Sequence, residues 1–249
     1  MTYTPFEFRV LPLFLYYFAL SIFSIFLTVK MYLKWRERKV PPPLYLTYTF
    51  IFFALAIVML TIGLSEAVIT GFYKEIYRFS LPFAYAMVVL ADIALFKFVS
   101  FLTNSGKKIF IPLVIIGFAV IIVLFLPWNW WGVPPEDYAG MLNIRLYSTL
   151  SLVIYSYFIY IQIAITSKKG MGATKDKITH MGLKLLFYAM ISMILFFLMF
   201  IGDTLMIALF DHPGYSEFVY VAWIFAILAY ILMYLSLVMP KWLVNRIQK

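Results

Sequence analysis

Long apolar stretches, separated by short polar segments, occupy almost the whole chain. A helix needs about 20 apolar residues, each rising ~1.5 Å, to cross the ~30 Å hydrocarbon core of a bilayer. Seven stretches reach or approach this length. The pattern therefore predicts an all-α, polytopic membrane protein built as a bundle of seven transmembrane helices. The predicted helices run near residues 10–29, 44–69, 81–102, 109–126, 146–166, 183–209 and 218–239.

The composition agrees with this class, because 65% of the residues are hydrophobic and the mean hydropathy is +0.96. Seven spans and their connections take up nearly all of the 249 residues. We therefore expect a single transmembrane domain, 1–249, with no enzymatic activity, no catalytic residues and no cofactor. Glu7 and Arg9 precede the first apolar stretch, so we interpret that stretch as a permanent span rather than a signal peptide.

Lysine and arginine are distributed unevenly over the connections, and this sets the expected orientation. If successive helices alternate in direction, fifteen of the twenty basic residues fall on one side of the membrane and four on the other. Cytoplasmic connections carry the excess of Lys and Arg in multi-pass proteins. We therefore expect the N-terminus outside, the C-terminus in the cytoplasm, and a multi-pass protein of the cell membrane. The basic residues on the cytoplasmic side are Lys30, Lys34, Arg36, Arg38, Lys39, Lys107, Lys108, Lys168, Lys169, Lys175, Lys177, Lys184, Lys241, Arg246 and Lys249.

The net charge of +9 then reflects topology and contact with lipid headgroups. Membrane lipids are the expected partners. Nucleic acid is not, because the basic residues form no stripe on a separate domain. Tryptophan and tyrosine anchor helices at membrane interfaces. The predicted outer anchors are Trp128, Trp130, Trp131 and Tyr138, and the inner ones are Trp35 and Trp242.

The two ends of the chain share a weak internal similarity. A shift of about 137 positions places the first three helices on the last three, with Arg9 falling on Arg145 and Glu66 on Asp203. Both groups of three would begin outside, so the repeat would be parallel. The sequence thus suggests a layout of three helices, one linking helix and three more, although any two apolar triplets align passably.

Asp92 lies about twelve residues into the third predicted helix, close to the middle of the membrane. A charged group in hydrocarbon is costly and is expected to face the bundle interior and to find a partner or water. Lys97 is five residues further on and ~140° around the helix, so it is a poor direct partner. Two interpretations of Asp92 stay open: a proton or ligand site, and a structural hydrogen bond between helices.

Glu66 and Asp203 lie near the predicted outer ends of the second and sixth helices. An outward-opening cavity lined by both carboxylates would favour a cationic or hydrogen-bond-donating ligand. The alternative is that both simply reach interfacial water. Further acidic residues of the predicted outer face are Glu136, Asp137, Asp211 and Glu217.

Polar and aromatic residues recur at helical spacing along the fifth, sixth and seventh predicted helices. These spacings place each set on one face, which we expect to point inward. Ordinary helix packing and the lining of a ligand pocket both explain such faces. The three sets are Ser148, Ser151, Tyr155 and Gln162; Tyr188, Ser192, Met199 and Asp203; and Trp223, Tyr230 and Tyr234. The predicted ligand-binding residues are Glu66, Asp92, Tyr155, Gln162, Asp203, Trp223 and Tyr230.

Several chemistries lack their required residues. The chain has no cysteine, so disulfides and thiolate chemistry are excluded. No HExxH motif occurs, and His180 and His212 fall on opposite sides of the predicted membrane, so no metal site is expected. A retinal Schiff base needs a lysine in the seventh helix, and Phe218–Met239 contains none.

The seventh helix closes in Pro240, Lys241, Trp242 and Leu243. This segment, together with the topology and length, resembles the closing part of the seven-helix sensor regions at the N-terminus of prokaryotic histidine kinases. The resemblance implies an outward ligand pocket and a signal passed through the seventh helix. The sequence ends at Lys249 without a kinase domain. We therefore expect a partner protein at the basic cytoplasmic loops to take up the signal.

Three functions follow as hypotheses. The preferred one is a receptor-like or sensor-like membrane protein that binds a small, unidentified ligand from the outer side. The first alternative is a small-solute or proton-coupled transporter with the three-one-three layout, for which Asp92 would be the coupling group. The second alternative is a structural subunit of a membrane complex.

Overall fold

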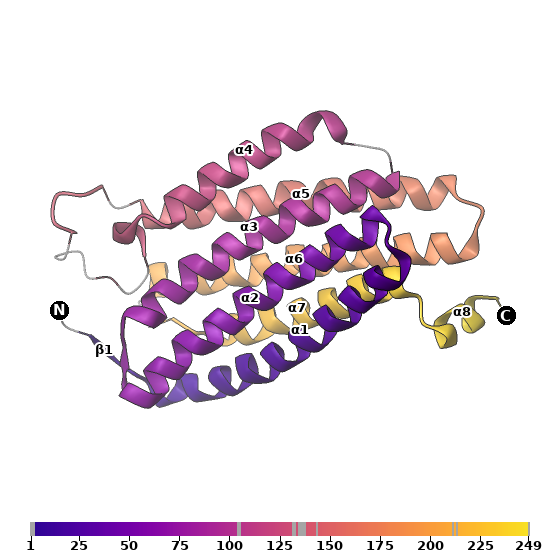
Figure 1. Ribbon diagram of the computed structural model, residues 1–249. Helices are drawn as coiled ribbons and strands as arrows, with labels where there is room; N and C mark the ends of the chain where they lie inside the picture. Colours follow the sequence, from indigo (N-terminus) through magenta and orange to yellow (C-terminus); the bar gives the residue numbers. More distant parts are fainter. Residues whose placement is uncertain are drawn as a thin grey trace. The chain divides into compact units, whose positions relative to one another are not determined.

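A computed structural model describes residues 3–103, 106–130, 133, 138–142, 144–210, 212 and 214–248. It consists of long helices and one sheet of two very short strands (Figure 1). The helices are α1 (Leu11–Arg38), α2 (Pro41–Thr70), α3 (Glu75–Thr103), α4 (Lys107–Leu124), α5 (Arg145–Ala173), α6 (Lys177–Phe210), α7 (Glu217–Val238) and α8 (Lys241–Gln248). The shorter elements are β1 (Thr4–Pro5), η1 (Phe8–Val10), β2 (Phe72–Tyr73) and η2 (Pro127–Asn129).

Seven of these helices are long and apolar enough to cross a membrane, and they match the seven predicted stretches. The fold is therefore that of an all-α, multi-pass integral membrane protein. Several helices continue well beyond their apolar stretch: α1 extends to Arg38 and α5 to Ala173. Hydropathy marks only the part of a helix that lies in hydrocarbon, so the polar turns beyond it were not predicted.

Proline and glycine mark several helix ends. Pro41, Pro42 and Pro43 form the first turn of α2, where a missing N–H costs nothing. Gly71 follows α2 with φ 72°, a left-handed conformation that glycine adopts without strain. Pro240 lies two residues beyond the end of α7, as the sequence predicted.

The chain divides into two compact units, Met1–Ser156 and Tyr157–Lys249, with α5 contributing to both. In the first unit, α1 packs on α2, and α2 on α3 (Figure 1). Ser21 and Thr61 share a hydrogen bond of 2.8 Å between α1 and α2. A Cβ atom at Gly63 would lie 2.3 Å from Ser80 Oγ, so only glycine lets α2 approach α3 this closely.

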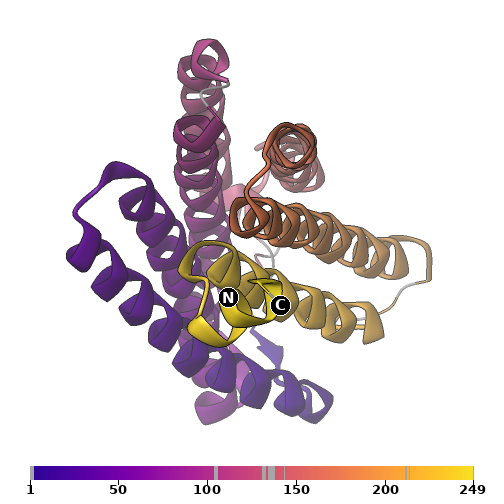
Figure 2. The ribbon, with the colours of Figure 1, turned by 90° about the vertical axis from the view of Figure 1, so that its right-hand side faces the viewer.

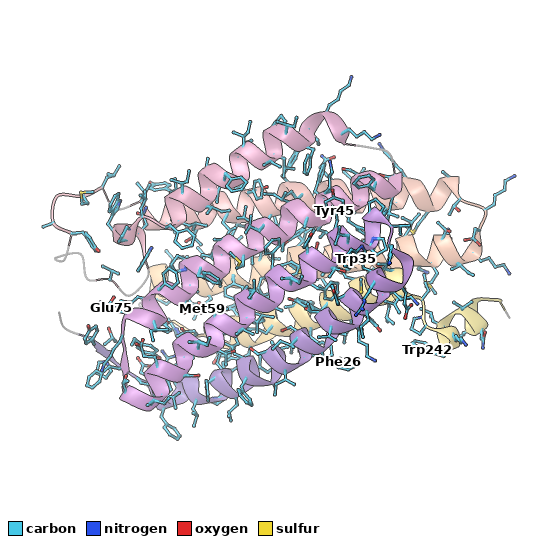
Figure 3. All side chains as sticks on the ribbon, viewed as in Figure 1. Phe26, Trp35, Tyr45, Met59, Glu75 and Trp242 are labelled. Carbon is cyan, nitrogen blue, oxygen red and sulfur yellow. The ribbon has the colours of Figure 1, made fainter. Side chains whose placement is uncertain are left out.

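The two short strands of the first unit join the N-terminal segment to the connection between α2 and α3. β1 pairs antiparallel with β2, with Thr4 opposite Tyr73. Phe6 N donates to Gly71 O at 2.8 Å, which fastens the N-terminal segment to the α2–α3 connection. Glu75, labelled in Figure 3, opens α3 beside this sheet and forms a salt bridge of 3.1 Å with the buried guanidinium of Arg78.

In the second unit, α6 and α7 pack side by side along their length. A Cβ atom at Gly182 would lie 2.9 Å from the backbone oxygen of Ser236, so the beginning of α6 lies against the end of α7. Trp223 on α7 meets Phe196 on α6 edge-on, with ring centroids 5.4 Å apart. The short helix α8, which the sequence reading did not predict, packs against α6.

Candidate functional site

Asp92 is the most deeply buried acidic side chain that the structure describes, with 0% of its surface exposed. It lies near the middle of α3, and Ser156 Oγ on α5 donates a hydrogen bond of 2.7 Å to its Oδ2. A carboxylate in hydrocarbon needs such a donor, because the alternative is an unsatisfied polar group away from water. The bond therefore ties α3 to α5 and offsets part of the cost of burying Asp92.

Tyr155 lies next to Ser156 and extends this polar contact to α4. Its hydroxyl donates to the backbone oxygen of Leu113 at 3.1 Å. It also interacts electrostatically with the carboxyl group of Asp92. A Cβ atom at Gly117 would lie 2.7 Å from Tyr155 Oη, so this glycine makes room for the ring. The structure thus brings together two predicted ligand-binding residues, Asp92 and Tyr155.

A small open pocket with about 10 Å³ of interior space lies nearer the N-terminal end of α3 and α5. This space holds about one water molecule, so a larger solute binds here only when the lining side chains move apart. The polar groups of its lining are the hydroxyls of Tyr85, Ser148 and Thr149, the amide of Asn129 and the indole of Trp130. The lining residues are Pro82, Tyr85, Leu124, Asn129, Trp130, Ser148 and Thr149.

Two of the lining residues, Asn129 and Trp130, differ in how their polar groups are hydrogen-bonded. Asn129, in η2, is buried; its Nδ2 donates to Val123 O at 3.3 Å, and its Oδ1 accepts from Ile144 N at 3.2 Å. It therefore holds together the two ends of the α4–α5 connection. The buried indole Nε1 of Trp130 has no hydrogen-bond acceptor among the described residues. An acceptor group on a bound solute would complete a hydrogen bond with this indole.

The pocket and Asp92 both lie where α3 faces α5. Tyr85 precedes Asp92 by seven residues, and Thr149 precedes Ser156 by seven. Seven residues are about two helical turns, or ~10 Å, and return to nearly the same face. Val89 and Leu152, one turn along each helix, are buried at 0% and 1% exposure. One apolar layer thus separates the pocket from the carboxyl group.

Glu66 has a different kind of partner. It is half-buried near the end of α2, and its Oε2 accepts a hydrogen bond of 2.9 Å from the backbone nitrogen of Tyr77. Tyr77 is in the first turn of α3, where backbone N–H groups have no partner within the helix. Glu66 therefore acts as an acceptor that caps the beginning of the next helix, where a negative charge is also favourable.

Asp203 has the same arrangement in the second unit. It is 9% exposed near the end of α6. Its Oδ1 accepts from the backbone nitrogen of Ser216 at 2.8 Å and from Ser216 Oγ at 2.7 Å. Ser216 is the residue before α7. Glu66 and Asp203, which matched in the predicted repeat, thus both accept hydrogen bonds from the start of the following helix.

The other predicted ligand-binding residues lie in the second unit. Trp223 and Tyr230 are buried on one face of α7, and Gln162 is half-buried on α5. Trp223 packs between aromatic rings of α6. On α6 one expectation was wrong: Tyr188 is 49% exposed, whereas Ser192 and Asp203 of the same set are buried. Its aromatic ring can face lipid at no cost, so helical spacing alone did not decide its direction.

Some expectations concern residues beyond the described part of the chain. These are the acidic residues Glu136, Asp137 and Asp211 and the outer anchor Trp131. The sequence reading also missed functional candidates, namely Ser156, Tyr85 and Thr149. Their signal was present as polar residues seven apart on each of two apolar helices, but the pairing of α3 with α5 was needed to give it meaning.

Comparisons with family models, with curated proteins and with solved structures found no match for this chain. The class of the protein therefore rests on its own sequence and structure: an integral membrane protein with seven apolar helices. Its candidate site is the α3–α5 seam, defined here as the pocket, the layer of Val89 and Leu152, and the Asp92–Ser156 hydrogen bond.

Proposed function

We propose that the protein is a receptor-like membrane protein of the cell membrane that binds a small polar solute in the α3–α5 seam. The observation that carries the proposal is the hydrogen bond between Asp92 and Ser156, two helical turns from the pocket and on the same faces of the same helices. The solute needs an acceptor group for the indole of Trp130 in the pocket, and a donor or positive charge to bind Asp92 once the layer of Val89 and Leu152 opens.

The proposed signal is a change in the bond that joins α3 to α5. A solute that reaches Asp92 competes with Ser156 for the carboxylate, so the two helices lose one direct connection. A ligand shifts a conformational equilibrium only by its differential affinity for the two states. Here the differential contact is the carboxylate, which Ser156 occupies in one state and the solute in the other.

The continuation of the signal rests on the orientation predicted from Lys and Arg. α5 leads from the seam directly to the basic α5–α6 connection, which is cytoplasmic in that orientation. A partner protein at the basic loops would then respond to a movement of α5. Such a signal is also what the resemblance to seven-helix sensor regions implies. Glu66 and Asp203 are not needed for binding in this proposal, because each caps a helix.

The test is a thermal-shift screen of the purified protein against small cations, amino acids and other polar metabolites. The same screen is run with Asp92→Asn, Ser156→Ala and Glu66→Gln. A bound ligand raises the unfolding temperature by mass action. We expect a solute that stabilises the wild type and Glu66→Gln but not Asp92→Asn. Loss of the response in Glu66→Gln with retention in Asp92→Asn would contradict the proposed location.

A proton-coupled transporter is the second candidate, and complete burial of Asp92 favours it. A carboxyl group away from water can carry a proton between the two sides if the helices around it rearrange. Uptake into vesicles distinguishes the two: loss of uptake in Asp92→Asn supports transport, whereas binding without flux supports a receptor. If no solute stabilises any variant, the structural-subunit hypothesis is favoured instead.

A further inference from the structure

The end of the second unit that carries α8 has an unusual combination of groups. α7 is an apolar span that ends at Val238, and α8 begins three residues later at Lys241. Met239 has a left-handed backbone with φ 44°, and the Pro240 oxygen accepts hydrogen bonds from Leu243 N and Val244 N at 2.9 and 3.1 Å. The chain therefore turns and starts a new helix just past the apolar segment, where the membrane interface must lie.

α8 is amphipathic. Leu243 is buried against the protein, whereas Lys241, Asn245 and Arg246 are exposed. Trp242, labelled in Figure 3, is 59% exposed, so most of its large ring is not covered by protein. Tryptophan combines an apolar body with an N–H donor and is enriched at the membrane–water interface. An uncovered tryptophan at this position is explained if lipid covers it.

The α5–α6 turn lies at the same end of the unit as α8, as both ribbon views agree (Figures 1 and 2). The packing of Gly182 against Ser236 and Met239 confirms this neighbourhood at the beginning of α6. Around the turn, the exposed basic side chains are Lys168, Lys169, Lys175, Lys177 and Lys184.

Within the described part of the chain, no acidic side chain forms a salt bridge with these basic groups, nor with Lys241 or Arg246. Asp176 is the acidic residue in the turn, and Thr179 already donates to its carboxylate through N at 2.8 Å and through Oγ1 at 2.5 Å. The surface therefore offers unpaired positive charge next to an uncovered aromatic ring.

We propose that α8 and the α5–α6 turn form a binding surface for anionic phospholipids. α8 lies in the membrane interface with Trp242 among the headgroups and upper acyl chains, as amphipathic helices of this composition do. The lysines of the turn, with Lys241 and Arg246, bind the phosphates. Each basic residue is expected to strengthen the preference for anionic lipid about fivefold near the surface. The surface is separate from the α3–α5 seam and does not depend on its function.

The lack of native cysteine allows a clean measurement of depth. Trp242→Cys and Asn245→Cys each give a single labelling site for a nitroxide spin label on the whole chain. The labelled proteins are reconstituted in phosphatidylcholine alone and in phosphatidylcholine with phosphatidylglycerol. We expect the label at 242 to be accessible to oxygen and shielded from a water-soluble relaxation agent, more so with phosphatidylglycerol, and the label at 245 to remain exposed to water.

Charge variants test the lipid itself. Lys241→Gln with Arg246→Gln, and Lys168→Gln with Lys169→Gln, should each lower the phosphatidylglycerol retained by the purified protein at least severalfold. Lys74→Gln, in the α2–α3 connection, is the matched control and should not change it. A water-exposed label at 242 in both membranes would overturn the proposal. So would unchanged lipid retention in both double variants, or complete displacement of the lipid by inorganic phosphate.

Discussion

Asp92 and Asp203 form nearly the same contact in the two units of the chain. Both are buried aspartates on long apolar helices, and both accept a hydrogen bond of 2.7 Å from a serine hydroxyl on another helix or its start. They differ in what else the serine contributes. Ser216 also donates its backbone N–H, at the beginning of α7, whereas Ser156 lies inside α5, where its backbone N–H belongs to the helix.

This difference separates a structural role from a candidate functional one. A carboxylate at a helix N-terminus satisfies backbone groups that exist in every conformation of a folded helix, so it is retained for stability. A carboxylate that accepts a hydrogen bond from a side-chain hydroxyl in the middle of a span can exchange that donor for a solute or a proton without unfolding a helix. Asp92 is therefore the better candidate for chemistry, although both aspartates were among the predicted ligand-binding residues.

The largest effect on stability is expected from Asp203→Ala. The substitution leaves the N–H and Oγ of Ser216 without their acceptor in a buried position, which costs about 1–3 kcal/mol of unfolding free energy. Asp203→Asn keeps an acceptor oxygen and should cost less than half as much. Denaturation of both variants in mixed micelles measures the difference. Equal stability of Asp203→Ala and the wild type would remove the capping role.

Gly117→Ala should come next, because it disturbs the packing around Asp92 rather than a helix cap. The new methyl group would lie 2.7 Å from Tyr155 Oη and 3.0 Å from Ile93 Cδ1. Overpacking of this kind costs about 1–2 kcal/mol. Gly172→Ala is the control, since a Cβ atom there meets nothing within 4 Å. The same denaturation assay should show loss of stability for the first variant and none for the second.

Ser156→Ala is expected to cost less, about 0.6 kcal/mol, which is typical of a hydrogen bond between transmembrane helices. Combined with Asp92→Asn in a double-mutant cycle, it gives the coupling energy of the pair directly. The corresponding cycle of Ser216→Ala with Asp203→Asn should give a smaller coupling, because the backbone N–H of Ser216 remains as a donor. A larger coupling at Asp203 would reverse the comparison.

The smallest effect on stability is expected at Asp176. This exposed carboxylate accepts a hydrogen bond from the first turn of α6, as the buried Asp203 does from the start of α7. The hydroxyl of Thr179 lowers the pKa of the Asp176 carboxyl group, as does the backbone N–H of the same residue. The folded state thus favours the carboxylate, so its contribution is present above the ordinary pKa of Asp and is lost as pH falls through the lowered pKa. Asp176→Asn should slightly flatten the acid side of the stability–pH profile, and an unchanged profile would show that water screens the contact.

The fold was largely predictable because hydropathy reports directly on the solvent of each segment. Each of the seven predicted stretches overlaps one observed span over most of its length. Pro240 follows the end of α7, as expected. The polar extension of α1 to Arg38 and the helix α8 were missed, since helices outside hydrocarbon leave no long apolar signal. The two-residue sheet of β1 and β2 was missed for a simpler reason: it is too short to show a period.

The candidate site was only half predictable. Asp92 stood out from its sequence alone, because a carboxyl group in the middle of an apolar helix demands an explanation wherever the helix packs. Ser156 did not stand out, since serine is common in membrane helices and only the packing of α3 on α5 gives it a partner. Glu66 and Asp203 looked like the rim of a cavity, and only the helix starts beside them revealed them as caps.

The sequence by itself determined the class of the protein, the number and approximate extent of its apolar spans, and the position of a carboxyl group, Asp92, in the middle of one of them. These follow from local composition, because the free energy of transferring a segment into hydrocarbon is nearly a sum over its own residues. The tertiary structure decided which carboxylates cap helices, which one accepts a hydrogen bond from a serine inside another helix, and which tryptophan the protein leaves exposed. Those properties depend on distances between residues far apart in the chain, which only the packing of the helices fixes.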